Sequence, residues 1–158
     1  LTAIRPIYKS FHPLHNEKNK IMGVSGMDTN LSIGLTGEKR ETVSNDNTAI
    51  KHVSGNLPVY ATPAMVALME GACVNAVAPH LAEGTSTVGI DLKIKHTAAT
   101  PVGLTVRAVG ELVEIDGKRL LFTVKAFDDK EQIGSGTNER FIIAAEKFLQ
   151  KAEAKKAD

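Results

Sequence analysis

The stretch VYATPAMVALMEGACVNAVAPHL, residues 59–81, decides the fold that the sequence predicts. Between its two prolines it is almost entirely apolar or small, and it carries one formal charge, Glu70. A helix that is apolar around most of its circumference has to be surrounded by other elements. Thr62 followed by Pro63 predicts the helix start, because a hydroxyl caps exposed backbone donors and a proline ring suits the first helical position. We therefore expect a buried helix over about residues 63–78.

Glu70 is the unexpected residue of this helix. An ionised carboxylate is costly to bury without a partner, because desolvation disfavours its charged form. Two explanations are open: either Glu70 pairs with a lysine such as Lys93 or Lys95, or it is a functional carboxylate. Cys73, in the same helix, is expected to pack rather than to react, because the sequence places no base near it.

After the helix the hydrophobic pattern changes to the period of a strand. Apolar side chains alternate with small or polar ones up to His96, which predicts a half-buried strand with Val88, Ile90, Leu92 and Ile94 on one face. The next strand, over residues 104–115, slips in its alternation near Gly110, where we expect a bulge.

The remaining strands follow from turn signals. Asp116-Gly117 predicts a hairpin turn that leads into a strand over residues 119–128 and, after DDKEQ, into another over residues 133–143. A short polar strand is expected near residues 39–44, and a short charged helix at the end of the chain. The economical arrangement is an antiparallel sheet curled around the buried helix, an α+β fold.

Composition limits the possible partners. The chain of 158 residues suffices for one domain, and its net charge of +1 is uneven: residues 1–26 carry +3, which leaves −2 for residues 27–158. The latter lack a basic footprint for nucleic acid, so no such partner is expected. Residues 1–26 show no sustained periodicity, and we expect a disordered extension or a vector-derived segment there, with the domain over residues 27–158.

Cysteine and histidine usage indicates the compartment and argues against a metal. A single cysteine, Cys73, excludes an intrachain disulfide and fits a reducing compartment. The five histidines lack the spacing to acids or thiols that a zinc site needs: His12, His15, His52, His80 and His96. No apolar run approaches the roughly 18 to 20 residues of a spanning helix, and the first residues lack the apolar core of a secretory signal. We expect a soluble, cytoplasmic protein without membrane contact.

Three ordered blocks give the sequence a family resemblance: ATPAMVALMEGACVNAVAPHL, STVGIDLKIKHTAATPVGLTV and IGSGTNERFII. Over roughly residues 33–148 the chain resembles the hot-dog-fold acyl-CoA thioesterases, most closely the fluoroacetyl-CoA thioesterase-like branch. The resemblance implies an antiparallel sheet wrapped around one long central helix. The segment KHVSGNLPVY, residues 51–60, departs from the aromatic pattern of the fluoroacetyl-specific enzymes, so that specificity is not inferred.

The resemblance also implies a set of site residues. Matched one for one with the family's catalytic group, they are Thr62, Glu70 and His96, and Gly89 and Arg140 fall in its substrate-binding region. Taken alone, each has an ordinary explanation: Thr62 as a helix cap, His96 as a core residue, Gly89 as a bulge, and Arg140 as the surface partner of Glu139.

The implied activity is hydrolysis of a small acyl-CoA thioester to free acid and CoA, without cofactor or metal. Glu70 would act as general base or attack directly, and His96 suits proton exchange near neutrality. Two alternatives remain: a hydratase or dehydratase acting on an acyl thioester, and a non-catalytic acyl-CoA-binding module. Because an isolated small sheet leaves an unpaired edge, and because the family implies sites near an interface, we expect at least a homodimer.

Overall fold

The computed structural model describes residues 30–156, so the expectations for residues 1–26 lie outside the described residues. The longer elements follow one another as β1 (Thr36–Thr42), α1 (Thr62–Val77), β2 (Thr85–His96), β3 (Thr105–Asp116), β4 (Arg119–Phe127), β5 (Gln132–Ala144) and α2 (Ala145–Glu153). Short 3-10 turns lie at η2 (Asn45–Asn47), η3 (Ala78–His80) and η4 (Ala154–Lys156).

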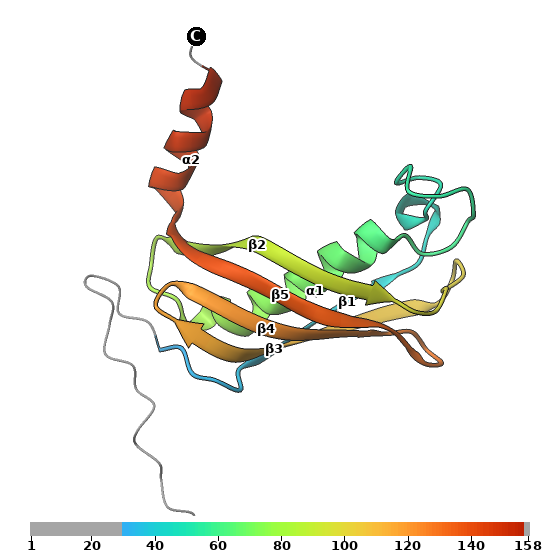
Figure 1. The fold of residues 1–158 in the computed structure, drawn as a ribbon. Helices are drawn as coiled ribbons and strands as arrows, with labels where there is room; N and C mark the ends of the chain where they lie inside the picture. Colours follow the sequence, from blue (N-terminus) through green and yellow to red (C-terminus); the bar gives the residue numbers. More distant parts are fainter. Residues whose placement is uncertain (1–29, 157–158) are drawn as a thin grey trace, which may run out of the picture.

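The strands form one curled sheet in the order β1-β3-β4-β5-β2, and every neighbouring pair is antiparallel. Helix α1 lies along one face of this sheet (Figure 1). The predicted antiparallel sheet around a buried helix is therefore confirmed. Strands β1 and β2 are the two edges of the described sheet, and α2 projects away from it at the end of β5 (Figure 1).

The core is the interface between α1 and the sheet. Half of the helix residues are buried: Ala64, Met65, Leu68, Met69, Ala72, Cys73, Ala76 and Val77. Two glycines on the sheet allow the close approach. A Cβ on Gly37 of β1 would lie 2.3 Å from the Ala72 carbonyl oxygen, and one on Gly110 of β3 would lie 2.8 Å from the Cys73 sulfur. The helix thus packs directly against the sheet backbone.

The start of α1 differs from the prediction in one respect. Thr62 is not the N-cap but the first helical residue; Ala61 is the N-cap and makes no side-chain hydrogen bond to the helix. Pro63 accordingly takes the second helical position rather than the first. The Thr62 hydroxyl is therefore available for a contact outside the helix.

Strand β2 contains a bulge that the sequence pattern does not reveal. Its register on β5 shifts between Gly89 and Asp91. Val88 pairs with the partly exposed Phe141, whereas Leu92 pairs with the fully buried Asn138. The expectation that Val88, Ile90, Leu92 and Ile94 share one face is therefore wrong, because the bulge reverses the alternation and leaves Ile90 54% exposed.

Other boundaries shift by a few residues. Strand β1 covers Thr36–Thr42 rather than residues 39–44. The bulge expected near Gly110 lies between Leu112 and Glu114, while Gly110 serves the close approach to α1. The predicted hairpin is confirmed, and Gly117 provides the positive φ of 57° that its turn requires.

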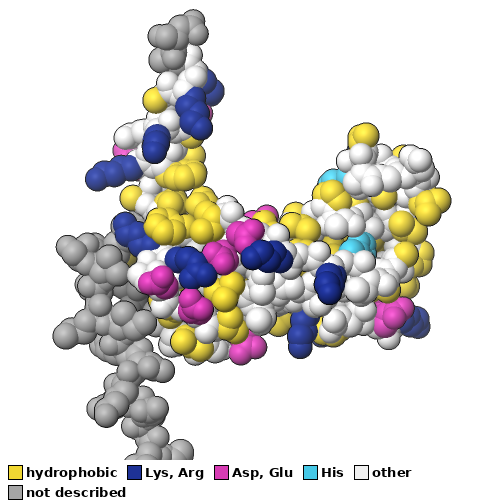
Figure 2. Space-filling view, viewed as in Figure 1, with side chains coloured by type: hydrophobic (Ala, Val, Ile, Leu, Met, Phe, Trp, Pro, Cys, Tyr) yellow, Lys and Arg dark blue, Asp and Glu magenta, His cyan; other side chains and the backbone are white. Residues whose placement is uncertain are grey.

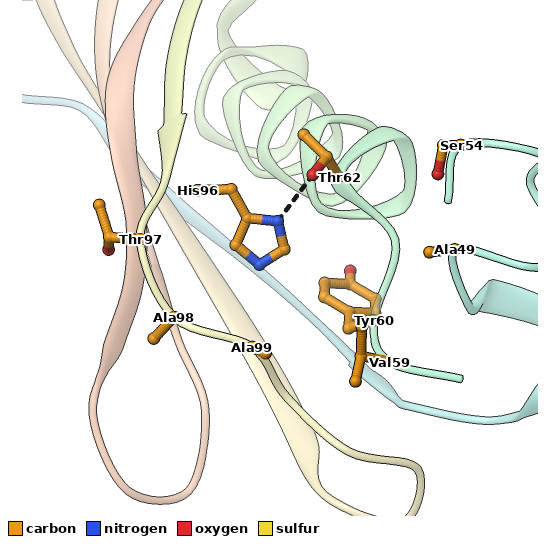
Figure 3. A pocket seen from close by; sticks show the side chains of 9 residues that line it. All are labelled: Ala49, Ser54, Val59, Tyr60, Thr62, His96, Thr97, Ala98 and Ala99. Atoms are coloured by element: carbon orange, nitrogen blue, oxygen red, sulfur yellow. Dashed lines mark hydrogen bonds between the residues drawn. The ribbon is translucent and has the colours of Figure 1, made fainter. Parts of the chain in front are cut away.

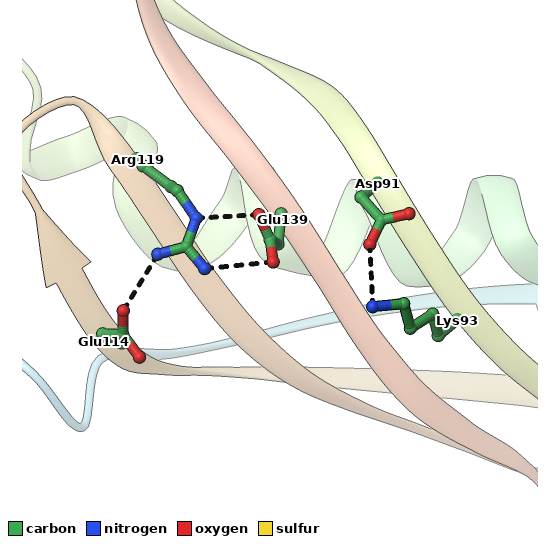
Figure 4. A network of polar contacts seen from close by, with 5 residues as sticks. All are labelled: Asp91, Lys93, Glu114, Arg119 and Glu139. Carbon is green, nitrogen blue, oxygen red and sulfur yellow. Dashed lines mark hydrogen bonds and ion pairs between the residues drawn. The ribbon is translucent and has the colours of Figure 1, made fainter.

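The outer face of the sheet carries ion pairs and a few apolar side chains. Arg119 bridges Glu114 and Glu139 at 2.9 and 2.8 Å (Figure 4). Glu139 is thus paired with Arg119, and the alternative explanation of Arg140 as the surface partner of Glu139 is wrong. Figure 2 shows hydrophobic side chains gathered where α2 leaves the sheet. Phe141 of β5 and Phe148 and Leu149 of α2 are exposed. None of the described helices has the length and apolar character to cross a membrane.

The packing of α1 on β1 gives a testable expectation. In Gly37→Ala the new methyl group meets helix backbone, which cannot rotate away, so we expect a loss of about 1 to 3 kcal/mol in unfolding free energy. Urea unfolding of the variant and of the parent protein measures this loss. Gly55→Ala is the control, since its Cβ would meet only the Ala49 methyl group, at 3.3 Å. Equal stability of the two variants would contradict the close packing.

Candidate active site

Thr62 and His96 meet at one end of α1. Thr62 is the first residue of the helix, His96 is the last residue of β2, and the Thr62 Oγ1 lies 2.8 Å from the His96 Nδ1 (Figure 3). The two side chains line a cavity of about 320 Å³. Its other walls come from the segment before α1 and the segment after β2: Ala49, Ser54, Val59, Tyr60, Thr97, Ala98 and Ala99.

The environment of His96 favours its neutral form. Burial lowers the pKa of His96, and the Ala98 backbone opposes this only in part. With its proton on Nε2, the neutral ring accepts a hydrogen bond from the Thr62 hydroxyl at Nδ1. Among the described residues, Nε2 has no hydrogen-bond partner although it is buried. The neutral ring is therefore held with Nδ1 as the acceptor for the Thr62 hydroxyl.

Glu70 has a partner, and it is neither of the expected lysines. The Arg140 Nη1 donates to the Glu70 Oε1 at 3.1 Å, while Lys93 pairs with Asp91 at 3.4 Å (Figure 4). The Arg140 side chain is only 6% exposed, whereas that of Glu70 is 34% exposed. Glu70 is thus a partly open carboxylate held by a buried cation.

Gly89 makes room for this ion pair. A Cβ at this position would lie 2.2 Å from the Glu70 Oε1. Since that distance is far below van der Waals contact, any larger residue would displace the carboxylate. Gly89 is therefore required by the close approach of Glu70, and it lies next to the bulge of β2.

In one copy of the chain the five predicted residues form two groups. Thr62 and His96 make one group, and Glu70, Gly89 and Arg140 make the other. Glu70 follows Thr62 by eight positions on α1, which at 1.5 Å per residue places it about 12 Å further along the helix axis. A single copy thus does not bring the carboxylate to the Thr62–His96 pair.

The sequence prediction missed two residues that support these groups. Thr87 bonds the Arg140 guanidinium through both its hydroxyl and its carbonyl oxygen. The buried Tyr60, in the cavity wall, donates its hydroxyl to Glu41 of β1, and burial together with this contact raises its pKa. Thr87 lies in the second of the three family-like blocks, but its partner in the third block is set only by the fold.

Two further expectations concern reactive groups. Cys73 is fully buried, and burial raises the pKa of its thiol to about 12, as suits a packing residue. Within residues 30–156, no group of three or more His, Cys, Asp or Glu side chains is placed to hold a metal ion.

The comparison with known proteins matches this arrangement to one family. The fluoroacetyl-CoA-specific thioesterases match residues 43–146. The chain belongs to this family. A fluoroacetyl-CoA thioesterase from Streptantibioticus cattleyicolor is 50% identical over 97 residues, which cover 61% of this chain and 70% of that protein.

Solved structures agree with the family assignment. A threonine-to-serine variant of the fluoroacetyl-CoA thioesterase in complex with acetyl-CoA superposes with a TM-score of 0.75 and 38% identity, covering 80% of this chain and 99% of that one. A thioesterase superfamily member from Thermus thermophilus has a TM-score of 0.71 and 28% identity, covering 80% and 97%. The predicted hot-dog fold and enzyme class, an acyl-CoA thioester hydrolase, are confirmed.

Burial of His96 predicts a pH-dependent stability. Its folded-state pKa lies below the unfolded value of about 6.5, so the unfolded chain takes up the proton first as the pH falls. The contribution of neutral His96 to the free energy of unfolding is therefore complete above about pH 6.5 and is lost as the pH falls. We expect urea unfolding of His96→Asn to depend less on pH between about 7.5 and 5 than unfolding of the parent protein. The exposed His52, changed to Asn, is the control; an unchanged slope in His96→Asn would contradict the burial effect.

Proposed function

We propose that this protein hydrolyses a small acyl-CoA thioester to the free acid and CoA, with Thr62, Glu70 and His96 as its catalytic residues. The observation that carries the proposal is the Thr62–His96 hydrogen bond at the wall of a cavity, in a member of a thioesterase family. The relatives were solved with acetyl-CoA, and with fluoroacetate and CoA, which supports an acyl-CoA ligand here.

The chemistry needs few groups because a thiolate is a fair leaving group. Glu70 takes a proton from water, the resulting hydroxide adds to the thioester carbonyl carbon, and the C–S bond breaks as the thiol leaves with a proton. In the alternative route Glu70 itself adds to the carbonyl and forms a mixed anhydride that water then opens. In both routes His96 exchanges a proton with the departing sulfur or with water, and Thr62 orients the ring through its hydroxyl. Backbone N–H groups at Gly89 or at the start of α1 stabilise the oxyanion.

Each active site contains residues from two copies of the chain. Strand β2 is an edge of the described sheet, so its outer side is open to a second strand. Gly89 and His96 lie seven residues apart on β2, about 23 Å along the strand. Antiparallel pairing of two β2 strands about a two-fold axis between Leu92 and Lys93 sets Gly89, with Glu70 beside it, opposite the partner's His96. A homodimer thereby unites the two groups that a single copy keeps apart.

The cavity favours a short acyl group. Met65 is fully buried and lies against Gly134, since a Cβ there would be 2.7 Å from its sulfur. Gly134 is the cross-strand neighbour of His96, so Met65 closes the space beneath the histidine. Most of the lining side chains are small, such as Ala49, Ser54 and Ala98, and Tyr60 is the aromatic one among them. We therefore do not assign specificity for fluoroacetyl-CoA.

This activity agrees with a cytoplasmic location. Acyl-CoA esters are the substrates of intracellular metabolism, and the chain's single cysteine is an unpaired, buried thiol. The proposed chemistry routes every proton through protein side chains and water, so neither a cofactor nor a metal takes part. Thiol release is accordingly expected to persist in the presence of a chelator.

Glu70→Gln tests the chemistry. The amide keeps the volume but can neither accept the proton nor add to the carbonyl, so we expect a loss of about 100-fold or more in the rate of thiol release. The measurement follows free CoA thiol with a panel of acyl-CoA esters. Cys73→Ala, which alters packing only, is the control and should keep its rate. A Glu70→Gln protein with the parent rate on every ester would refute the mechanism.

Subunit mixing tests the composite site. Glu70→Gln and His96→Ala homodimers are each expected to be inactive, but a mixed dimer has one intact site. Random exchange in an equal mixture makes about half of the dimers mixed, so activity should return to roughly a quarter of the parent value. No recovery after verified exchange, or a monomer in light scattering at micromolar concentration, would overturn the two-copy arrangement.

Met65 sets the acyl length. Each buried CH₂ is worth about 0.8 kcal/mol, so Met65→Ala should move the optimum of kcat/KM toward acyl chains longer by several carbons. The parent enzyme should prefer two to about four carbons. Met69→Ala, one turn further along the buried face of α1, is the control and should keep the parent preference. A parent kcat/KM that rises steadily into long chains would show that the pocket is a tunnel.

A further inference from the structure

Arg140 is held from two directions. It is almost fully buried on β5 and makes three hydrogen bonds. Its Nε donates to the Thr87 hydroxyl at 2.9 Å, and its Nη2 donates to the Thr87 carbonyl oxygen at 3.0 Å. The remaining bond, from Nη1, is the one to Glu70.

These contacts divide the guanidinium into two functional edges. Nε and Nη2 lie on the same edge of the planar group, and Thr87 occupies that edge with two oxygens. With this edge fixed, Nη1 can point only toward Glu70. Removing the hydroxyl would leave a buried N–H without an acceptor, and the guanidinium would have to turn to recover one.

We propose that Thr87 is a positioning residue: its hydroxyl orients Arg140 so that the guanidinium holds the Glu70 carboxylate in one place for catalysis. The inference rests on the proposed role of Glu70. Thr87 itself touches neither the Thr62–His96 pair nor the cavity. Its backbone pairing with Ile142 in the sheet does not depend on the hydroxyl, so a loss of positioning is separable from a loss of fold.

The test compares variants of Thr87 in the full-length chain, with acetyl-CoA as the probe. Thr87→Val keeps the shape and removes the hydroxyl; we expect kcat to fall about 10-fold with KM changed less than twofold. Thr87→Ser, which keeps the hydroxyl, should restore kcat to within about threefold of the parent. If Thr87→Val does not fold, as judged by its thermal unfolding, Thr87→Ala replaces it with the same expectation.

The control is Thr85→Val. Thr85 lies two residues earlier on β2, and its hydroxyl bonds the Ala82 carbonyl oxygen at 2.6 Å rather than Arg140, so this variant should keep the parent kcat. An inactive Glu70→Gln together with a Thr87→Val at parent kcat would overturn the positioning role alone. A fully active Glu70→Gln would overturn both this inference and the proposed mechanism. A Thr87→Ser as slow as Thr87→Val would show that packing, not the hydroxyl, matters.

Discussion

The burial of α1 against the sheet backbone is the constraint on which the rest of the molecule depends. The helix can approach so closely because Gly37 and Gly110 present no side chains to it. Its axis is thereby fixed, and with it the position of every side chain that it carries. Thr62 comes to lie at the end of β2 beside His96, and Glu70 comes to lie part-way along, near the open edge of the sheet. The proposed catalytic groups are therefore placed by core packing.

Much of the fold could be predicted because it follows from local periods. The apolar run of α1 and the Asp116-Gly117 turn each act over a few residues, and both are confirmed. The strands that the alternation predicts are present too, although the faces predicted for β2 are wrong. The wrong predictions concern features that depend on contacts between segments far apart in the sequence. The bulge of β2 depends on its pairing with β5, and Thr62, which is the first helical residue rather than the N-cap, bonds His96 at the end of β2.

The candidate site was less predictable from single residues. The family-like blocks indicate Thr62, Glu70 and His96. The residues taken alone favour a helix cap for Thr62 and a core histidine for His96, and they leave Glu70 open between a lysine pair and a functional carboxylate. The partner of Glu70 could not be found in this way, because Arg140 is separated from it by most of the sheet-forming sequence and becomes buried only when β5 pairs with β2. The role of Thr87 could not be predicted for the same reason, since a threonine in a strand does not by itself indicate which residue it contacts.

The bulge in β2 connects these observations. In a regular strand, Thr87 and His96 would lie on opposite faces, since they are an odd number of residues apart. The extra residue at the bulge reverses the alternation once, so that Thr87 bonds the buried Arg140 and His96 reaches Thr62 on the same, helix-facing side. As a result, Ile90 is exposed and Val88 lies on the outer face of the sheet, beside Phe141. A single irregularity in one strand thus lets that strand support both the ion pair of Glu70 and the Thr62–His96 pair.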